Sequence, residues 1–392
     1  MTPSARVQAG IELLDEVIAS ARDDGPPADA IVAAYFKTRR YAGSKDRRAV
    51  RELVFRAIRR SAEIPETGRS AMLGLSADDR EILDSFTGPP HGPDPVIKGE
   101  KRTPASLLPP WIERELSPLV TRDEWPALVQ RAPLDIRVNA ARTTREAIAE
   151  AFPGAEPTPL SPWGLRLPPD TRVDQSEAFA DGLVEVQDEG SQLIALACAA
   201  KPGMRIVDLC AGAGGKSLAL ASATSNGAEI IACDTNRQRL SKLPHRADRA
   251  GATITSRLLD APREAEALVS LQASADVVLV DAPCSGSGTW RRSPEGRWRL
   301  TADRLARVIA LQARVLDLAA PLVKPGGALV YAVCSLLGRE GMDQVASFLG
   351  RHSGWSVQDP LVDVGRLDGA GRLLTPGHDM TDGFFIARFI RS

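Results

Sequence analysis

The sequence has no uninterrupted run of the roughly 18 apolar residues that a membrane-spanning helix requires. Its five cysteines are odd in number and form no C-x-x-C pair, and its four histidines are scattered. These absences argue against a membrane protein, a disulfide scaffold and a metal site, so we expect reduced thiols in the cytoplasm. The first 20 residues place acids within an apolar helical pattern, which predicts an amphipathic helix and not a signal peptide.

Charge is balanced overall, with a formal net charge of −1, but it is uneven along the chain. Residues 37–60 hold ten Lys/Arg against two acids, and a second basic group alternates with tryptophans. Such patches indicate a docking face for nucleic acid, although a solvated helix face explains the first run equally well. The tryptophans could stack on RNA or be buried. The first run comprises Lys37, Arg39, Arg40, Lys45, Arg47, Arg48, Arg51, Arg56, Arg59 and Arg60, and the second Arg291, Arg292, Arg297 and Arg299 with Trp290 and Trp298.

Apolar periodicity divides the chain into four parts. Residues 1–88 are expected to be all helical, and the Pro- and Gly-rich residues 89–104 to form a linker. Residues 105–185 predict a small α+β domain, whereas residues 186–392 alternate apolar strands with helical stretches. This alternation predicts an α/β fold with a parallel, doubly wound sheet. No helix separates the last two strands, so we expect the last strand to be antiparallel and at the edge.

A glycine-rich turn, DLCAGAGGK (residues 208–216), follows the first apolar strand of the C-terminal part. Ligands of open α/β sheets bind beyond the carboxyl ends of the strands, so this turn is a candidate cofactor site. The turn by itself also fits a dinucleotide binder such as an NAD enzyme. However, it lacks the G-x-G-x-x-G spacing that cradles a pyrophosphate. The pattern therefore favours S-adenosylmethionine over NAD.

Acidic residues end the next three apolar strands. Asp234 lies about 20 residues after the glycine turn, where a carboxylate accepts hydrogen bonds from the ribose hydroxyls. Asp260 is expected within reach of the adenine amino group, and Asp281 ends the following strand. For each aspartate taken singly, a helix cap or a turn is the alternative role.

Two cysteines end separate strands. Cys284 lies in DAPCSGSGT, and Cys334 ends ALVYAVCS. Cys198 and Cys233 fit positions in a buried core, and Cys210 lies in the glycine turn. We therefore expect only the first pair at the sheet edge where the cofactor would bind.

Thiol chemistry at this edge suits methylation of cytosine. Carbon 5 of cytosine is a poor nucleophile, but a thiolate that adds to carbon 6 makes it reactive toward a methyl sulfonium. A base must then remove the proton from carbon 5, and the thiol must leave. Nearby cations favour the thiolate, and Lys216 and the arginines after Trp290 are candidates.

These motifs resemble the RNA cytosine-5 methyltransferases of the Nop/Sun type. The chain is most similar to the bacterial small-subunit ribosomal RNA branch, which has an N-terminal helical domain similar to the antitermination factor NusB. The resemblance implies a Rossmann-like class I methyltransferase with an antiparallel last strand, which uses S-adenosylmethionine. It also implies RNA as the partner, namely ribosomal small-subunit RNA, with no DNA and no membrane, and a monomer. The matching stretches are RAPLDIRVN, VQDEGSQL, DLCAGAGGK, DAPCSGSGTWRRSPEGRW, LVYAVCSLLGREG and PGHDMTDGFFIARF.

The resemblance also implies roles for individual residues. Cys334 would be the nucleophile, Cys284 would help to release the product, and Asp281 would bind and activate the target base. Lys216 is the fourth catalytic candidate. The cofactor would be held by Cys210, Ala211, Gly212, Ala213, Gly214, Gly215, Lys216, Asp234, Asp260 and Asp281.

Three positions depart from the family pattern. Ala213 replaces a common proline, which should affect loop stiffness, whereas Val333 and Gly341 replace threonine and asparagine and could alter base positioning.

Two alternative functions stay open. The chain could be a non-catalytic RNA-binding or ribosome-assembly factor on the same fold, or it could carry out the same chemistry on transfer RNA.

Overall fold

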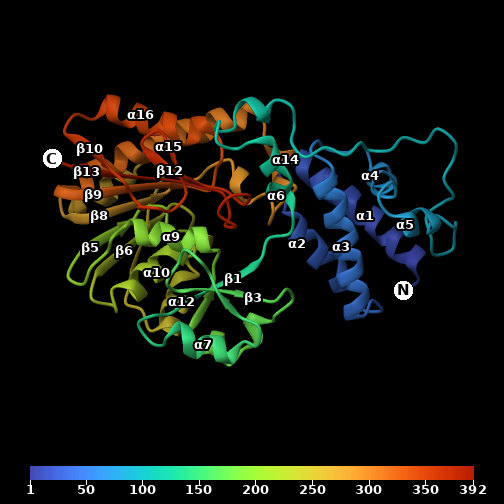
Figure 1. Cartoon of the computed structure of the whole chain (residues 1–392), viewed down its shortest axis with the longest axis horizontal. Helices are drawn as coiled ribbons and strands as arrows, with labels where there is room; N and C mark the ends of the chain where they lie inside the picture. The colour runs from blue at the N-terminus through green and yellow to red at the C-terminus, as the bar shows by residue number, and fades with distance from the viewer. The chain divides into compact units, whose positions relative to one another are not determined.

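The computed structural model describes all of residues 1–392, and its contacts divide the chain into two compact units (Figure 1). We call the first the helical unit and the second the sheet unit. Each unit is assembled from segments that are discontinuous in sequence. The helical unit contains residues 1–115, 125–131 and 289–301, and the sheet unit contains residues 116–124, 132–288 and 302–392.

The helical unit is built from amphipathic helices that bury their apolar stripes in one core. In α3, Val50, Val54 and Ile58 recur at the spacing of one helical face and are fully buried. Thr67 caps α4 through a capping box with Ser70. The elements of the helical unit are α1 (Pro3–Arg22), α2 (Ala28–Thr38), α3 (Ser44–Arg60), α4 (Gly68–Leu75), α5 (Arg80–Asp84), η1 (Ile112–Arg114), α6 (Trp125–Val129) and α14 (Gly296–Arg299). The short helix η5 (Ser287–Thr289) ends in this unit with Thr289.

The sheet unit begins with a small antiparallel sheet in the order β2-β3-β1-β4. Ile136 of β1 pairs with Leu165 of β3 and with Val186 of β4. The α7 helix covers this sheet through the buried side chain of Ile148, which joins the same small core. The elements are η2 (Arg122–Glu124), β1 (Leu134–Val138), α7 (Arg145–Ala151), β2 (Glu156–Pro157), β3 (Gly164–Leu167), η3 (Val173–Gln175), α8 (Glu177–Ala180) and β4 (Val184–Val186).

The large sheet has nine strands, with β11-β12-β13-β9-β8-β5-β6-β7 in order and β10 paired with β13. The strands β5 to β9 are parallel, which confirms the Rossmann-like class, and β13 is antiparallel to β9. The expectation that the last strand lies at the edge is wrong, because β12 also pairs with β13. The strands are β5 (Arg205–Asp208), β6 (Glu229–Asp234), β7 (Thr255–Leu258), β8 (Ala275–Asp281), β9 (Val323–Val333), β10 (Trp355–Gln358), β11 (Arg366–Asp368), β12 (Gly371–Leu374) and β13 (Phe384–Arg391).

Helices cover both faces of this sheet: α15 and α16 lie on one face and α9 and α10 on the other (Figure 1). Leu193 of α9 and Leu220 of α10 join Val277 of β8 in a buried cluster. No helix in the structure combines the length and the apolar character needed to cross a membrane. The helices are α9 (Glu189–Ala197), α10 (Gly215–Ala223), α11 (Arg237–Leu240), α12 (Leu243–Ala250), α13 (Glu264–Leu268), η4 (Val269–Leu271), α15 (Ala302–Ala319), η6 (Ala320–Leu322), η7 (Gly338–Glu340) and α16 (Met342–Arg351).

Candidate active site

A pocket of about 490 Å³ opens at the carboxyl ends of the parallel strands. This is the edge at which open α/β sheets bind their ligands. Both sequence-predicted catalytic cysteines line it, as do two of the predicted acids. The lining residues are Leu209, Cys210, Asp234, Thr235, Asn236, Arg239, Leu259, Ala261, Glu264, Asp281, Ala282, Pro283, Cys284, Leu311, Arg314, Val315, Leu318 and Cys334.

The thiols of Cys284 and Cys334 lie side by side, with their sulfur atoms 3.2 Å apart. The two strands that carry them, β8 and β9, are neighbours in the sheet, so their ends meet. The hydrogen bond to Cys334, together with burial, raises the pKa of the Cys284 thiol well above its usual value. Cys334 is only partly buried and faces the pocket, so its sulfur is not sealed in the core.

Lys216 and Asp281 form an ion pair beside the cysteines, with Nζ and Oδ2 separated by 2.6 Å. Burial lowers the pKa of the Lys216 ammonium, but the Asp281 carboxylate outweighs this effect and the net pKa is raised. Cys334 is a further electrostatic neighbour of the same ammonium. The ion pair therefore favours the charged form of Lys216, an electrostatic neighbour of the thiol that the sequence marks as the nucleophile.

The glycine turn lies in the first loop of the sheet, between β5 and α10. The carboxylate of Asp234, at the end of β6, accepts the N–H of Gly212 and the N–H of Asn236, each at 2.6 Å. Gly212 and Gly214 have φ values of +56° and +81°, and a Cβ on Gly214 would lie 2.2 Å from Leu243. The turn is thus held in a shape that only glycine adopts easily.

These residues fit the expected cofactor. Each oxygen of the Asp234 carboxylate keeps a further lone pair beside the pocket, as ribose hydroxyls require. Leu259 and Ala261 with Pro283 offer an apolar lining suited to a flat base. S-adenosylmethionine therefore suits both the polar and the apolar parts of the pocket.

The remaining residues predicted to bind the cofactor differ in whether they line the pocket. Asp260 is exposed and follows β7, between two lining residues, but does not itself line the pocket. Cys210 lines the pocket, and burial raises the pKa of its thiol well above the usual value. Cys198 and Cys233 are fully buried, which confirms their assignment to the core.

Sequence reasoning missed a group of polar residues beneath the cysteines. Glu340 accepts hydrogen bonds from the backbone N–H of Ser285 and from the side chain of Gln312, both at 2.8 Å. It also accepts a hydrogen bond from the hydroxyl of Ser335. The position of Glu340 just after the cysteine motif was a visible signal, but its partners lie on other elements.

Only part of the second basic group can face solvent, because Arg291 and Arg297 are buried whereas Arg292 and Arg299 are half-buried. Its role as a docking face stays a prediction. It belongs to the helical unit, where Arg297 is buried and donates to the carbonyl oxygens of Ile58 and Arg59 at 2.7 and 3.1 Å. The indole N–H of Trp298 donates to the carbonyl of Ser61 at 2.8 Å. Trp290 is buried as well. Both tryptophans and Arg297 therefore pack and bond within the helical unit, which is the buried alternative that the sequence left open for the tryptophans.

The three residues that depart from the family pattern, Ala213, Val333 and Gly341, lie in different environments in the structure. The carbonyl of Ala213 accepts a hydrogen bond from Arg246 at 2.6 Å. Val333 is fully buried in β9 and does not line the pocket. A Cβ on Gly341 would lie 2.8 Å from the ring of Phe385, so a larger residue there requires the ring to move.

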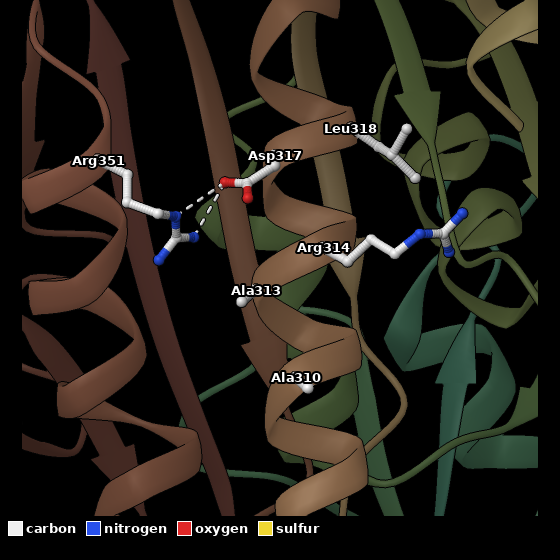
Figure 2. Close-up of a pocket in the computed structure, with 6 residues that line it drawn as sticks. All are labelled: Ala310, Ala313, Arg314, Asp317, Leu318 and Arg351. Carbon is white, nitrogen blue, oxygen red and sulfur yellow. Dashed lines mark hydrogen bonds and ion pairs between the residues drawn. The ribbon is translucent and has the colours of Figure 1, made fainter. Parts of the chain in front are cut away.

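A second hollow, of about 520 Å³, lies along α15 and α16. Figure 2 shows Asp317 bonded to Arg351 at one side of it, with Arg314 pointing the other way. The hollow contains neither cysteine nor any predicted acid. It is therefore not the site of thiol chemistry.

Fold and site together define a Rossmann-like α/β methyltransferase. A family model described as 16S rRNA methyltransferase RsmB/F matches residues 195–390, half of the chain. Ribosomal RNA small subunit methyltransferase B of Salmonella paratyphi B is 35% identical over 294 residues. That match covers 73% of this chain and 66% of the relative's own length.

Solved structures agree with this class. The crystal structure of PH0851 has a TM-score of 0.79 at 23% identity and covers 99% of each chain. A methyltransferase homolog protein from Pyrococcus horikoshii has a TM-score of 0.59 at 26% identity, covering 69% of this chain and 90% of the other. The chain belongs to the RsmB/F family of 16S rRNA methyltransferases. This membership supports S-adenosylmethionine as its cofactor.

Proposed function

We propose that this protein transfers a methyl group from S-adenosylmethionine to carbon 5 of a cytosine in RNA, and that the RNA is 16S ribosomal RNA. The observation that carries the proposal is the pair of thiols 3.2 Å apart beside the Lys216–Asp281 ion pair. A methyltransferase that modifies an already nucleophilic atom has no need of such a pair.

The pocket at the carboxyl ends of β5, β6 and β8 would hold the cofactor. The turn from Cys210 to Lys216 and the carboxylate of Asp234 would bind its polar groups, and Asp260 would reach the base from the rim. When bound, S-adenosylmethionine supplies an electrophilic methyl group. Asp281 lies in the same lining and pairs with Lys216 of the cofactor loop.

The chain's own residues would carry the covalent step. The Cys334 sulfur, as thiolate, forms a bond to carbon 6 of the base, and the electron pair of the 5,6 double bond becomes available at carbon 5. Lys216 stabilises the thiolate, and Asp281 holds the base by a hydrogen bond. After methylation, loss of the carbon 5 proton to a base restores the double bond and expels the Cys334 thiolate. Cys284 assists this release.

Incorporation of labelled methyl groups into RNA tests the proposal. The Cys334→Ala variant should lose incorporation, because no other thiol at the site replaces its sulfur. Cys198→Ala is the matched control, because that cysteine is buried in the core away from the pocket, and it should keep activity. Full activity of Cys334→Ala would contradict the assignment. Bisulfite sequencing of ribosomal and transfer RNA, with and without the gene, separates the two substrates.

We also propose that the first basic run docks the RNA. Lys37, Arg40 and Lys45 are exposed around the turn between α2 and α3, next to Tyr41, whose exposed fraction is 72%. Such a group of cations and an aromatic ring suits an unpaired RNA strand. Replacing the three cations by Ala should lower the salt dependence of RNA affinity, by about 0.7 in logarithmic slope for each lost phosphate contact. An unchanged slope would argue against this face.

The expected limits 1–88, 89–104, 105–185 and 186–392 stay a prediction for the domains. We propose that the first of them is the NusB-like part and that the protein acts as a monomer. Sedimentation of the purified chain with and without RNA would test the monomer.

A further inference from the structure

Glu340 lies beneath the thiol pair and is completely buried. A buried carboxyl group is costly unless its oxygens accept hydrogen bonds. Here Oε1 accepts two, from the N–H of Ser285 and the side-chain amide of Gln312, each at 2.8 Å. Oε2 accepts the hydroxyl of Ser335. No cation is among these donors.

The donors come from different parts of the fold. Ser285 follows Cys284 directly, and Ser335 follows Cys334 directly. Gln312 belongs to α15, and the same amide also donates to the carbonyl of Pro283 at 3.0 Å. One carboxyl group therefore ties both cysteine-bearing turns to one helix.

Further hydrogen bonds close the arrangement. The hydroxyl oxygen of Ser287 lies 3.1 Å from that of Ser335 and accepts the N–H of Leu336 at 2.9 Å. The N–H of Gly288 donates to the carbonyl of Cys334 at 3.0 Å. A Cβ on Gly288 would lie 2.0 Å from the carbonyl oxygen of Gly383. Glu340 is the charged member at the centre of this network.

We propose that Glu340 is a positioning residue that bonds to both cysteine-bearing turns, sets the spacing of the two thiols and makes them chemically unequal, with Cys334 as the nucleophile. The role in catalysis rests on the proposed function, but the inequality of the thiols does not. The proposal explains why two chemically identical side chains, 3.2 Å apart, take different parts in the reaction.

The two thiols have neighbours of opposite charge: the carboxylate of Glu340 acts on Cys284, whereas the ammonium of Lys216 acts on Cys334. In addition to the hydrogen bond that Cys284 makes to Cys334 and to burial, the negative charge of Glu340 raises the pKa of the Cys284 thiol. Tyr331 lies on this side too, and its hydroxyl donates to the backbone carbonyl of Glu340 at 2.7 Å. Lys216, paired with Asp281, lies on the Cys334 side.

The test is the rate of alkylation of each cysteine by iodoacetamide, measured by mass spectrometry on the full chain as a function of pH. It needs neither RNA nor cofactor, so it is independent of the proposed function. In the native chain Cys334 should react first. In Glu340→Gln, Oε1 can keep its two donors but the charge is lost, so Cys284 should react about tenfold faster, the change that one pKa unit produces. The alkylation rate of Cys334 should change by less than about twofold, which is much smaller than the tenfold change expected for Cys284.

Glu124→Gln is the matched control, because Glu124 is also a buried carboxyl group of the sheet unit but bonds to Arg366 and Thr375. It should leave both rates unchanged. Glu340→Asp keeps the charge and should keep Cys284 slow, which gives a reading even if Glu340→Gln fails to fold. An unaltered Cys284 rate in Glu340→Gln, an equal rise in the control, or a fast Cys284 in Glu340→Asp would each overturn the proposal.

Discussion

The Cys334 sulfur lies 3.2 Å from the Cys284 sulfur, although 50 positions separate the two residues in sequence. The parallel pairing of β8 with β9 brings them together. The proximity matters chemically, because a proton can pass between the sulfurs without any movement of the chain. The pair is thus suited to a reaction that first forms and then breaks a bond to sulfur.

The two cysteines should differ in what their loss leaves behind. Cys284→Ala should accumulate a covalent protein–RNA adduct, because Cys334 can still add to the base but release is slowed. The measurement is denaturing gel electrophoresis of protein incubated with RNA and S-adenosylmethionine. Cys334→Ala and the double variant should show no adduct. An adduct in Cys334→Ala that is absent from Cys284→Ala would show that the roles are reversed.

Loss of Lys216 should slow methyl transfer strongly. Lys216→Met removes the cation beside Cys334 and leaves the Asp281 carboxylate without its ion-pair partner. A decrease of about 100-fold in single-turnover rate is expected, the usual effect of removing one electrostatic contact from an active site. The exposed Lys242 provides the control as Lys242→Met. A rate equal to that of the control would remove Lys216 from the catalytic group.

Arg297 should matter for stability and not for RNA contact. Its buried guanidinium donates to the carbonyl oxygens of Pro294, Ile58 and Arg59. Arg297→Met should lower the free energy of unfolding by about 3 kcal/mol, because these carbonyl groups lose their partner. Thermal unfolding checks this, with the exposed Lys45→Met as control. A loss no larger than that of the control would contradict the buried role.

Asp208 should make stability depend on pH. Burial raises the pKa of this carboxyl group from 3.8 to about 7, although a hydrogen bond from Ser217 opposes the shift. Between these pH values the Asp208 carboxyl keeps its proton in the folded chain but has released it in the unfolded chain. The contribution of Asp208 to the free energy of unfolding is therefore full below about pH 4 and is lost as the pH rises to about 7.

The Asp208→Asn variant removes this titration. Relative to it, the native chain should lose up to about 4 kcal/mol of unfolding free energy across that interval and no more above it. Urea unfolding at several pH values measures the difference, and the exposed Asp303→Asn serves as control. A native chain that loses stability relative to Asp208→Asn as the pH falls from about 7 to about 4 would show the opposite sign and would refute the prediction.

Local patterns in the sequence predicted most of the sheet unit. Apolar strands ending in Asp234, Asp281 and Cys334, each followed by a helical stretch, indicated where the sheet edge and its ligands lie. This works because a parallel strand, its loop and its helix are contiguous in sequence. The hairpin of β11 and β12 was not predicted, since its strands have only three and four residues. Together with β10, that hairpin pairs with the side of β13 that faces away from β9, so the last strand does not lie at the edge.

The amino-acid sequence by itself determined the chemical groups of this protein: a glycine turn that adopts left-handed conformations, acids at strand ends and two cysteines in small-residue turns. Only the tertiary structure decided which groups meet. It paired Lys216 with Asp281, brought Glu340 beneath the cysteines, and buried Arg297 where charge alone suggested a nucleic-acid face. The physical reason is that burial and pairing depend on contacts between residues far apart in the chain, which no local pattern records.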